Sequence, residues 1–311
     1  MNREEFSVAA VPPFRLDLTA WALRRRPENE MDHWDGQTYR RVLMIHDRPI
    51  ELTAQQIRNP ERPRLLVTLH AARITPGTKA VARSLLERML GLRTDLAPFY
   101  ELAARDAKIA PITEEFRGLK PPRFPSVFEA VVNGIACQQL SLLVGILLLN
   151  RLTRRFGSAA LNPVRAFPDP DRLAIAKIRS LRSLGLNTNK SSALIELSRT
   201  IRDRRLDLEA VAALDNQAAL KTMLTIKGVG RWTAEYALLR GLGRLDSFPG
   251  DDVGAQKNLV HFLDLKRSLS YGGVQRLVAR WQPYAGFIYF HLLLASIKNA
   301  GWLQLGNSGY P

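Results

Sequence analysis

A five-residue loop constrains the fold of this chain more than any other feature. Residues 226–230 read Ile-Lys-Gly-Val-Gly, and apolar residues recur at helical spacing on both sides, over 217–225 and 231–242. Gly228 and Gly230 permit a tight reversal, because glycine reaches backbone conformations that other residues rarely adopt. The sequence therefore predicts two short helices that meet at a hairpin.

The same hairpin is suited to hold an anion. A helix that begins near Arg231 presents unpaired N–H groups and the positive end of its dipole, which fits a DNA phosphate. Arg231 and Lys227 can add positive charge, and Val229 can fix the turn in the core. An ordinary turn between two helices, with a solvated Lys227, is an equally good interpretation of the loop taken alone.

Two adjacent acids follow the hairpin. Asp251 and Asp252 come after Pro249 and Gly250 and before a helical stretch at 253–263. Either can be the N-cap of that helix, and either can be catalytic. Because consecutive residues at a helix start point in different directions, we do not expect them to cooperate as the acid pair of a glycosidase does.

The first part of the chain mixes strand and helix patterns. Strand-like runs lie at 42–45 and 65–69, and the second of these alternates its apolar side chains between two faces. A helical pattern covers 78–91, where Thr78 can cap the start and Gly91 supplies the stop. This combination predicts an α+β domain.

A proline-rich connector after Lys120 indicates a domain boundary. It reads Pro-Pro-Arg-Phe-Pro over 121–125, which cannot continue a helix. Beyond it strand-like alternation is hard to find, while helical patterns recur between breaks at 128–136, 142–156, 171–184 and 190–202, and then at the two hairpin helices. We therefore predict an α+β domain at 1–120 and an all-α domain at 121–311.

The charge balance favours a polyanionic partner. Forty-five Lys and Arg against 29 Asp and Glu give a net charge of +16 and an isoelectric point near 10.5. Nucleic acid and an acidic membrane surface both fit this charge, and nucleic acid is favoured because no amphipathic Lys-rich helix stands out. The apolar run at 142–149 is too short to span a membrane.

A single cysteine, Cys137, excludes several kinds of site. With one cysteine, the chain cannot supply the four cysteine ligands of a zinc site or an iron–sulfur cluster, and it cannot form an intramolecular disulfide. The first residues contain acids where a secretory signal has basic and then apolar residues. We expect an intracellular protein, cytoplasmic and associated with the nucleoid if the source is bacterial.

Several separate motifs together resemble the helix-hairpin-helix DNA glycosylase superfamily, and within it the 3-methyladenine DNA glycosylase II branch. The hairpin is followed by an acid that matches the family's catalytic Asp. The other matching segments are Cys137-Gln138-Gln139-Leu140-Ser141, Leu184-Gly185-Leu186 with Lys190, and Arg280-Trp281-Gln282-Pro283-Tyr284 with His291. The resemblance covers most of 126–311 and, more loosely, the α+β domain in front, and it implies two helical subdomains with a DNA cleft between them.

The resemblance assigns the chemistry to Asp252, which matches the second Asp of the family's motif. Breaking a base–sugar bond develops positive charge on the sugar, and a carboxylate beside it stabilises that charge or orients the attacking water. Bifunctional members carry a nucleophilic lysine two residues after the second hairpin glycine, where this chain has Trp232. The resemblance therefore implies a monofunctional enzyme that leaves an abasic site. Lys227 and Lys257 are assigned to phosphate contact or solvated surface.

The base pocket is expected around two aromatic residues on the second hairpin helix. Trp232 and Tyr236 are four residues apart and share a face, which by itself also fits core packing. An alkylated cationic base would stack on such rings. Trp21 is a weaker pocket candidate, and Leu293 stands where the branch can carry another aromatic residue.

The resemblance also assigns DNA contacts and a cation site. DNA contacts are expected at the hairpin and at the segment that fills the hole left by a flipped base, namely Lys227, Gly228, Gly230, Arg231, Thr233, Gln139, Leu140 and Ser141. Ser141 can also simply cap the next helix. Main-chain carbonyls of Leu224, Ile226 and Val229 match those that bind a monovalent cation, Na⁺ or K⁺, in the family; no other cofactor is expected.

The expected partner is double-stranded DNA containing damaged bases, and the expected state is a monomer. The leading hypothesis is a glycosylase that excises alkylated bases of the 3-methyladenine and 7-methylguanine type. The alternatives are a non-catalytic helix-hairpin-helix DNA-binding protein and a glycosylase for hypoxanthine, uracil or an oxidised purine. A peripheral membrane protein is the most distant alternative.

Overall fold

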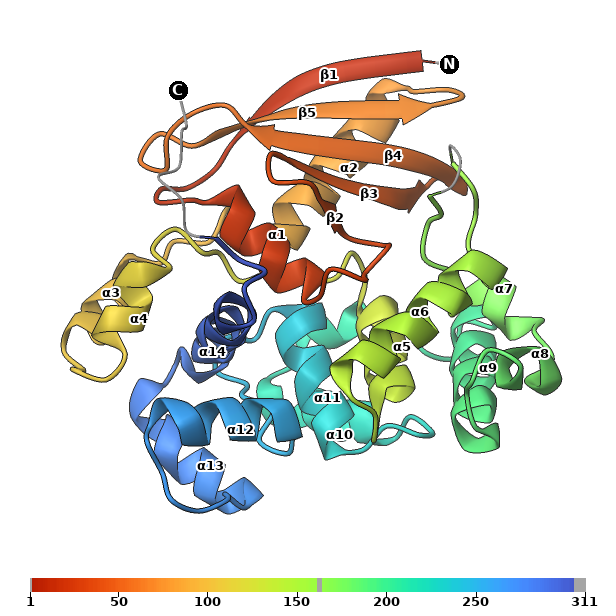
Figure 1. Ribbon diagram of the computed structural model, residues 1–311. Coiled ribbons are helices and arrows are strands. Elements are labelled where there is room, and N and C mark those ends of the chain that lie inside the picture. Colours follow the sequence, from red (N-terminus) through yellow and green to blue (C-terminus); the bar gives the residue numbers. More distant parts are fainter. Residues whose placement is uncertain (1, 161–163, 305–311) are drawn as a thin grey trace.

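The computed structural model describes residues 2–160 and 164–304. The N-terminal part of the chain forms one antiparallel sheet (Figure 1). Its strand order is β1-β5-β4-β3-β2. The strands are β1 (Asn2–Ala9), β2 (His33–Trp34), β3 (Thr38–Ile45), β4 (Arg48–Gln56) and β5 (Arg64–Ala71). Both predicted strands are confirmed within β3 and β5, and Leu65, Val67 and Leu69 of β5 are fully buried. The sequence analysis did not predict β1 and β4.

The helix α2 (Pro76–Met89) follows the sheet and corrects one predicted cap. Its N-cap is Thr75, not Thr78. The Thr78 N–H donates to Thr75 Oγ1 at 3.1 Å, and the Thr75 N–H donates to Thr78 Oγ1 at 3.3 Å. Thr78 therefore occupies the other position of a reciprocal capping box, and Pro76 can stand at the first helical position because no N–H bond is needed there.

The other α-helices of the described chain follow the sheet, except for one between β1 and β2. They are α1 (Leu16–Arg24), α3 (Ala97–Ala104), α4 (Ala110–Glu115), α5 (Val127–Cys137), α6 (Leu142–Phe156), α7 (Pro170–Ala174), α8 (Ile178–Arg182), α9 (Thr188–Arg202), α10 (Asn216–Leu224), α11 (Arg231–Ala237), α12 (Val253–Phe262), α13 (Tyr271–Val278) and α14 (Ala285–Asn299). An α+β part followed by helices is thus the observed fold class. No helix in the described part of the chain has the length and apolar character needed to cross a membrane.

Two predicted helices differ from the structure. The pattern at 171–184 is split into α7 and α8, because Lys177 takes an extended conformation with ψ of 141°. The pattern at 231–242 is α-helical only to Ala237 and continues as a π-helical turn, Leu238–Leu242, which ends at Gly243 with φ of +79°. Periodicity alone does not distinguish these local changes from a continuous helix.

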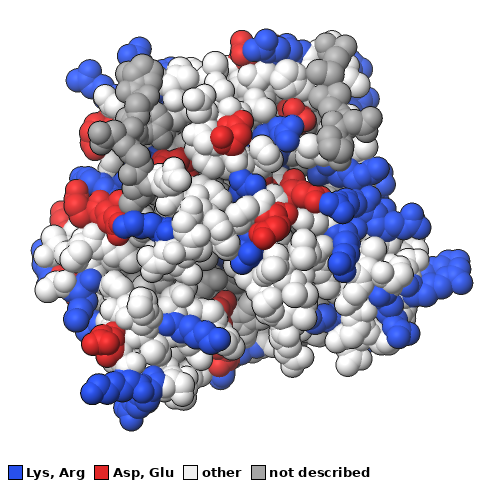
Figure 2. All heavy atoms as spheres, in the orientation of Figure 1, with Lys and Arg blue, Asp and Glu red and all other residues white. Residues whose placement is uncertain are grey.

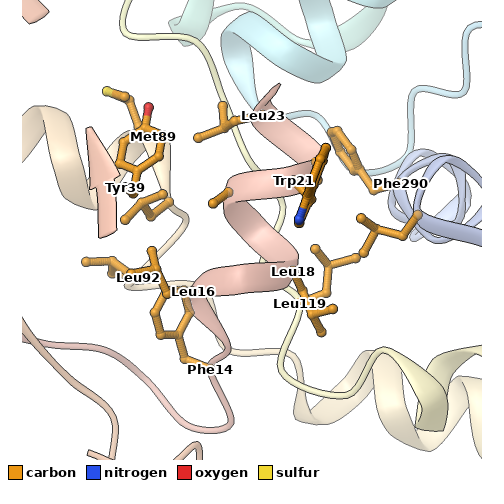
Figure 3. Close-up of a cluster of buried hydrophobic side chains, with 14 of the residues drawn as sticks. Phe14, Leu16, Leu18, Trp21, Leu23, Tyr39, Met89, Leu92, Leu119 and Phe290 are labelled. Atoms are coloured by element: carbon orange, nitrogen blue, oxygen red, sulfur yellow. The ribbon is translucent and has the colours of Figure 1, made fainter. Parts of the chain in front are cut away.

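Buried hydrophobic side chains form two clusters. The first, here called the sheet core, combines the strands and α1–α4 with α12, α13 and α14. The second, the helical core, is built mainly by α5, α6, α9, α10 and α11. Figure 3 shows Trp21 of α1 facing Phe290 of α14 in the sheet core. The C-terminal helices thus share a core with the N-terminal sheet, while the domain boundary at Lys120 stays a prediction.

A buried ion network joins the sheet to α5. Arg41 of β3 donates to Asp32 Oδ1 at 2.6 Å and is also hydrogen-bonded to Glu129 of α5. The Tyr39 hydroxyl donates to the same Asp32 oxygen at 2.6 Å. Burial raises the pKa of Glu129, which the Arg41 charge opposes. Removing any one of these buried charges would destabilise the fold, because its partner would be left buried and unpaired.

Candidate active site

The predicted hairpin connects α10 to α11. Gly228 has φ of +79°, and a Cβ there would lie 2.6 Å from Ala193 Cβ, so this position requires glycine. Gly230 is the N-cap of α11 and has open space where a Cβ would be. Val229 is buried, as predicted. The hairpin therefore packs closely at Gly228 and leaves the start of α11 uncovered at Gly230.

Side chains from α5 and its C-terminal end hold the hairpin in place. The Gln138 side-chain amide donates to the Gly228 carbonyl and to Thr233 Oγ1, both at 2.8 Å. Thr233 is buried, and Gly134 of α5 allows it to approach, since a Cβ there would lie 2.6 Å from Thr233 Cγ2. The Thr233 side chain, predicted to contact DNA, is thus turned towards α5.

Asp252 combines two roles that the sequence left as alternatives. It is the N-cap of α12, where Oδ1 accepts from the Ala255 N–H at 2.9 Å. Its Oδ2 accepts from Trp232 Nε1 at 3.0 Å and from the Tyr289 hydroxyl at 3.4 Å. One oxygen therefore begins the helix while the other lies among aromatic side chains of α11 and α14.

Asp251 takes a different direction, as predicted for adjacent residues at a helix start. Its Oδ2 accepts from Arg231 Nε at 2.7 Å. The Arg231 guanidinium also lies 3.6 Å from the centroid of the Tyr271 ring. Lys227 pairs with Glu196 of α9 at 2.7 Å. Both predicted phosphate ligands thus lie at the surface in ion pairs, which are weak enough to be replaced by a phosphate.

A buried carboxylate that the sequence analysis missed holds the loop before Asp252. Glu235 Oε2 accepts from the Gly250 N–H at 3.1 Å, and Oε1 accepts from the Tyr271 hydroxyl at 2.6 Å. Burial raises the pKa of Glu235, and burial beside this acid raises the pKa of Tyr271 to about 12. The available signal was an acid between Ala234 and Tyr236, followed by an apolar run.

Trp232 and Tyr236 lie beside Asp252 on α11. Their ring centroids are 5.5 Å apart at an interplanar angle of 31°. Trp232 is half-buried and Tyr236 is buried. The Tyr236 hydroxyl accepts from Arg25 Nη1 at 2.8 Å, while Arg25 Nη2 donates to Asn133 Oδ1 at 2.9 Å. The pair is therefore fixed from the N-terminal part of the chain by an arginine that sequence reasoning missed.

The other two predicted pocket residues lie in or against the sheet core. Trp21 is buried there, with the Arg24 guanidinium 5.3 Å from its ring centroid. Leu293 is half-buried and packs against the same core. Among the described residues, no ring contact or side-chain hydrogen bond connects either of them to Asp252, Trp232 or Tyr236. Tyr289, which does contact Asp252, was not predicted.

The predicted wedge segment, Gln139 and Leu140, is exposed, and Lys190 holds the chain just before it. Gln139 has φ of +56°, an uncommon conformation for a residue other than glycine. Leu140 is 39% exposed, and Ser141 caps α6 by accepting from the Val144 N–H at 3.3 Å. Lys190 donates to the carbonyls of Ala136 and Gln138, at 3.0 and 2.6 Å, and so fixes the end of α5.

The carbonyls predicted to bind a cation belong to this hairpin. Leu224 ends α10, and Ile226 and Val229 lie in the turn that follows. The Ile226 carbonyl accepts from the Val229 N–H at 3.0 Å. A carbonyl oxygen has a second lone pair, so this hydrogen bond leaves room for a cation.

Comparisons with known proteins place this site in a family. The HhH-GPD superfamily of base excision DNA repair proteins matches residues 132–283. A DNA-3-methyladenine glycosylase of Bacillus subtilis is 30% identical over 212 residues, which are 65% of this chain and 69% of that protein. DNA-3-methyladenine glycosylase 2 of Escherichia coli is 29% identical over 177 residues, which are 56% of this chain and 60% of that protein.

Solved structures share the fold over nearly the whole chain. A 3-methyladenine DNA-glycosylase from Archaeoglobus fulgidus aligns with a TM-score of 0.81 at 23% identity, covering 94% of this chain and 98% of that one. An 8-oxoguanine glycosylase/lyase of Clostridium acetobutylicum, in complex with double-stranded DNA, aligns with a TM-score of 0.75 at 16% identity, covering 96% and 99%. The chain belongs to the HhH-GPD superfamily of base excision DNA repair proteins.

Proposed function

We propose that this protein is a monofunctional DNA glycosylase that flips alkylated bases out of double-stranded DNA and hydrolyses their N-glycosidic bond, leaving an abasic site. The observation that carries the proposal is the Asp252 carboxylate, held at the start of α12 beside Trp232 and Tyr289 and next to the hairpin. The names of the Bacillus and Escherichia relatives, both DNA-3-methyladenine glycosylases, support 3-methyladenine as one of these bases, and we propose 7-methylguanine beside it.

The chemistry follows from the charge that develops as the base leaves. The sugar becomes cationic, and Asp252 stabilises that cation or orients the water that attacks it. Hydrogen bonds from Trp232 Nε1, Tyr289 and the Ala255 N–H fix the carboxylate in advance. A base methylated on a ring nitrogen is already cationic and leaves without a proton donor, so one acid is sufficient.

Trp232 supports a hydrolytic reaction without strand cleavage. It stands where lyases of this superfamily carry a nucleophilic lysine, and its indole nitrogen donates to Asp252. An indole N–H is a donor only and does not form a Schiff base. We expect borohydride to trap no covalent adduct between protein and DNA, as read from a denaturing gel. A trapped adduct would overturn the monofunctional proposal.

The aromatic pair would bind the flipped base. Stacking of a cationic base on a ring contributes about 0.5–2 kcal/mol per contact, and Trp232 and Tyr236 offer two adjacent rings. The exposed segment of Gln139 and Leu140 would fill the hole in the duplex. A panel of duplexes with 3-methyladenine, 7-methylguanine, hypoxanthine, uracil or 8-oxoguanine separates the alkylated bases from the alternative lesions.

We also propose that the hairpin carbonyls of Leu224, Ile226 and Val229 hold Na⁺ or K⁺ beside the bound phosphate, and that the protein acts as an intracellular monomer. Such a cation would supply positive charge to the phosphate and takes no part in bond cleavage. Carbonyl oxygens suit a hard cation, and they lie in one short turn.

The catalytic proposal is tested by two adjacent substitutions. Asp252→Asn keeps an N-cap that can begin α12 but removes the negative charge. We expect base release from methylated duplex DNA to fall about 10²- to 10³-fold, as for loss of other charge-stabilising groups. Asp251→Asn is the matched control, because it removes a neighbouring carboxylate that contacts Arg231 instead of Trp232.

Free base release is measured by chromatography under single-turnover conditions. Wild-type rates in the Asp252→Asn variant would refute the assignment of Asp252. A wild-type protein that binds methylated duplex and releases no base would instead support the non-catalytic DNA-binding alternative.

A further inference from the structure

Positive charge is concentrated in one segment outside the candidate active site. Residues 142–205 contain thirteen Lys or Arg and four Asp or Glu, so they carry +9 of the net charge of +16. The segment comprises α6, α7, α8 and α9. Figure 2 shows Lys and Arg side chains gathered at the right of the drawn face, where Figure 1 places these helices.

A groove in this region has more cationic than acidic side chains in its lining. It has a volume of about 820 Å³ and lies between the α7–α8 connection and α9. Lys177, Arg179, Arg199 and Arg205 line it, and Glu196 is the acidic residue among its lining side chains. A groove whose charged side chains are mostly of one sign attracts a ligand of the opposite sign.

The cations at its edge are available to a ligand. Lys177 and Arg179 are exposed, and neither makes an ion pair within the described residues. In the described part of the chain, Arg205 pairs with Asp203 alone, at 3.4 Å on the surface. Ion pairs this exposed contribute little, so a phosphate can compete for Arg205.

The groove is continuous with the hairpin. Lys227 of the hairpin contacts two residues that line the groove, Glu196 at 2.7 Å and Ser192 at 3.3 Å. A duplex whose phosphate is held at the start of α11 would therefore meet these cations on its way out of the site. This continuity identifies the ligand as the same polyanion that the hairpin would hold.

We propose that the groove between the α7–α8 connection and α9 is a second DNA-binding surface, which holds the sugar-phosphate backbone of undamaged duplex beside the lesion. The groove would not distinguish one DNA sequence from another, because side chains that contact phosphates do not contact the bases. Its role is to raise affinity for undamaged duplex. The inference adds to the proposed glycosylase activity, and its test uses DNA without a lesion.

The test compares two double charge reversals in the full-length protein. Lys177→Glu with Arg179→Glu changes the groove, while Arg48→Glu with Arg62→Glu makes the same change of charge at exposed turns of the sheet. Affinity for an undamaged duplex is measured by fluorescence anisotropy at several salt concentrations between about 50 and 200 mM. Circular dichroism melting confirms that each variant is folded.

The slope of log K against log salt is negative, and each lost phosphate contact reduces its magnitude by about 0.9. We therefore expect the groove variant to have a slope about 2 smaller in magnitude and an affinity about ten-fold or more lower at low salt. The sheet variant should keep the wild-type slope. Lys177→Gln with Arg179→Gln, which removes charge without reversing it, should fall between the two.

Equal slopes in the groove and sheet variants would overturn the proposal. They would indicate that the cations of the groove serve another ligand, such as an acidic protein. If the slopes differ but the wild-type protein releases no base from methylated DNA, the second DNA surface stands and the glycosylase proposal fails.

Discussion

The sheet core and the helical core contribute different parts of the candidate active site. The helical core supplies the hairpin, Trp232 and Tyr236 through α11. The sheet core supplies α12, which Asp252 begins, and Tyr289 of α14 packs against it. Asp252 therefore meets Trp232, its partner from the helical core, where the two cores meet. The site thus depends on how the two cores pack together, and not on either core alone.

Polar contacts at this junction are buried and specific. Arg41 connects β3 to α5, and Arg25 reaches Tyr236 of α11. Glu235 of α11 holds the loop that leads to α12 through Gly250. Hydrophobic packing tolerates small shifts between layers, whereas buried hydrogen bonds impose direction and distance. Substitutions at these contacts therefore test whether the site depends on how the two cores pack together.

The largest effect is expected from the ion network that joins the two cores. Arg41→Met leaves Asp32 and Glu129 buried without their partner, so we expect the free energy of unfolding to fall by about 3–5 kcal/mol. Arg154→Met is the matched control, since Arg154 of α6 pairs with Glu30 on the surface and should cost less than about 1 kcal/mol. Urea unfolding measures both, and equal losses would contradict a special role of the buried network.

A second effect is an acid sensitivity that belongs to the sheet core. His291 of α14 is fully enclosed in the sheet core beside Phe99 and Phe287, and burial lowers its pKa to about 4. The unfolded chain, with a pKa near 6.5, binds the proton more tightly than the folded one. The stability present above pH 6.5 is therefore lost as the pH falls towards 4, by about 3 kcal/mol from this group.

Nuclear magnetic resonance titration of the His291 ring provides the direct measurement. The ring should stay neutral down to about pH 4, well below the pKa near 6.5 of a histidine in an unfolded chain. A His291 that takes up its proton near pH 6.5 with the fold intact would remove the predicted acid sensitivity of the sheet core.

The smallest of these effects lies within the helical core, at the hairpin. Gly228→Ala combines φ of +79° with a contact of 2.6 Å to Ala193, so we expect a loss of about 2 kcal/mol in stability and weaker binding to duplex DNA. Gly230→Ala is the internal control, because its Cβ would enter open space at φ of −95°. Thermal melting and anisotropy measure both variants. Equal effects would show that the two glycines share one role.

Much of the local structure could be predicted from the sequence. The helix α6 has the predicted bounds, and the hairpin helices begin within a residue of the prediction. Ser141 and Asp252 are N-caps because a side-chain oxygen can reach the N–H three residues ahead. Such features depend on neighbours in the chain, which a sequence displays directly.

The residues that were missed depend on distant parts of the chain. Arg25 and Tyr236 are separated by 211 positions, and Asp252 and Tyr289 by 37. No local pattern marks an arginine in a basic run or a tyrosine in an apolar helix as part of a site. Trp21 and Leu293 were predicted by resemblance and lie in or against the sheet core, as Tyr289 does, and their place in a base pocket stays a prediction.

The hairpin, a tryptophan in place of a lysine at position 232 and two acids at a helix start can all be recognised in the sequence. Which of the two acids lies among the aromatic residues depends on how the helices pack in three dimensions. Asp252 receives hydrogen bonds from Trp232 and Tyr289, while Asp251 pairs with Arg231. The physical reason is that neighbouring side chains at a helix start diverge, and their partners come from α11 and α14, which meet only when the two cores pack together.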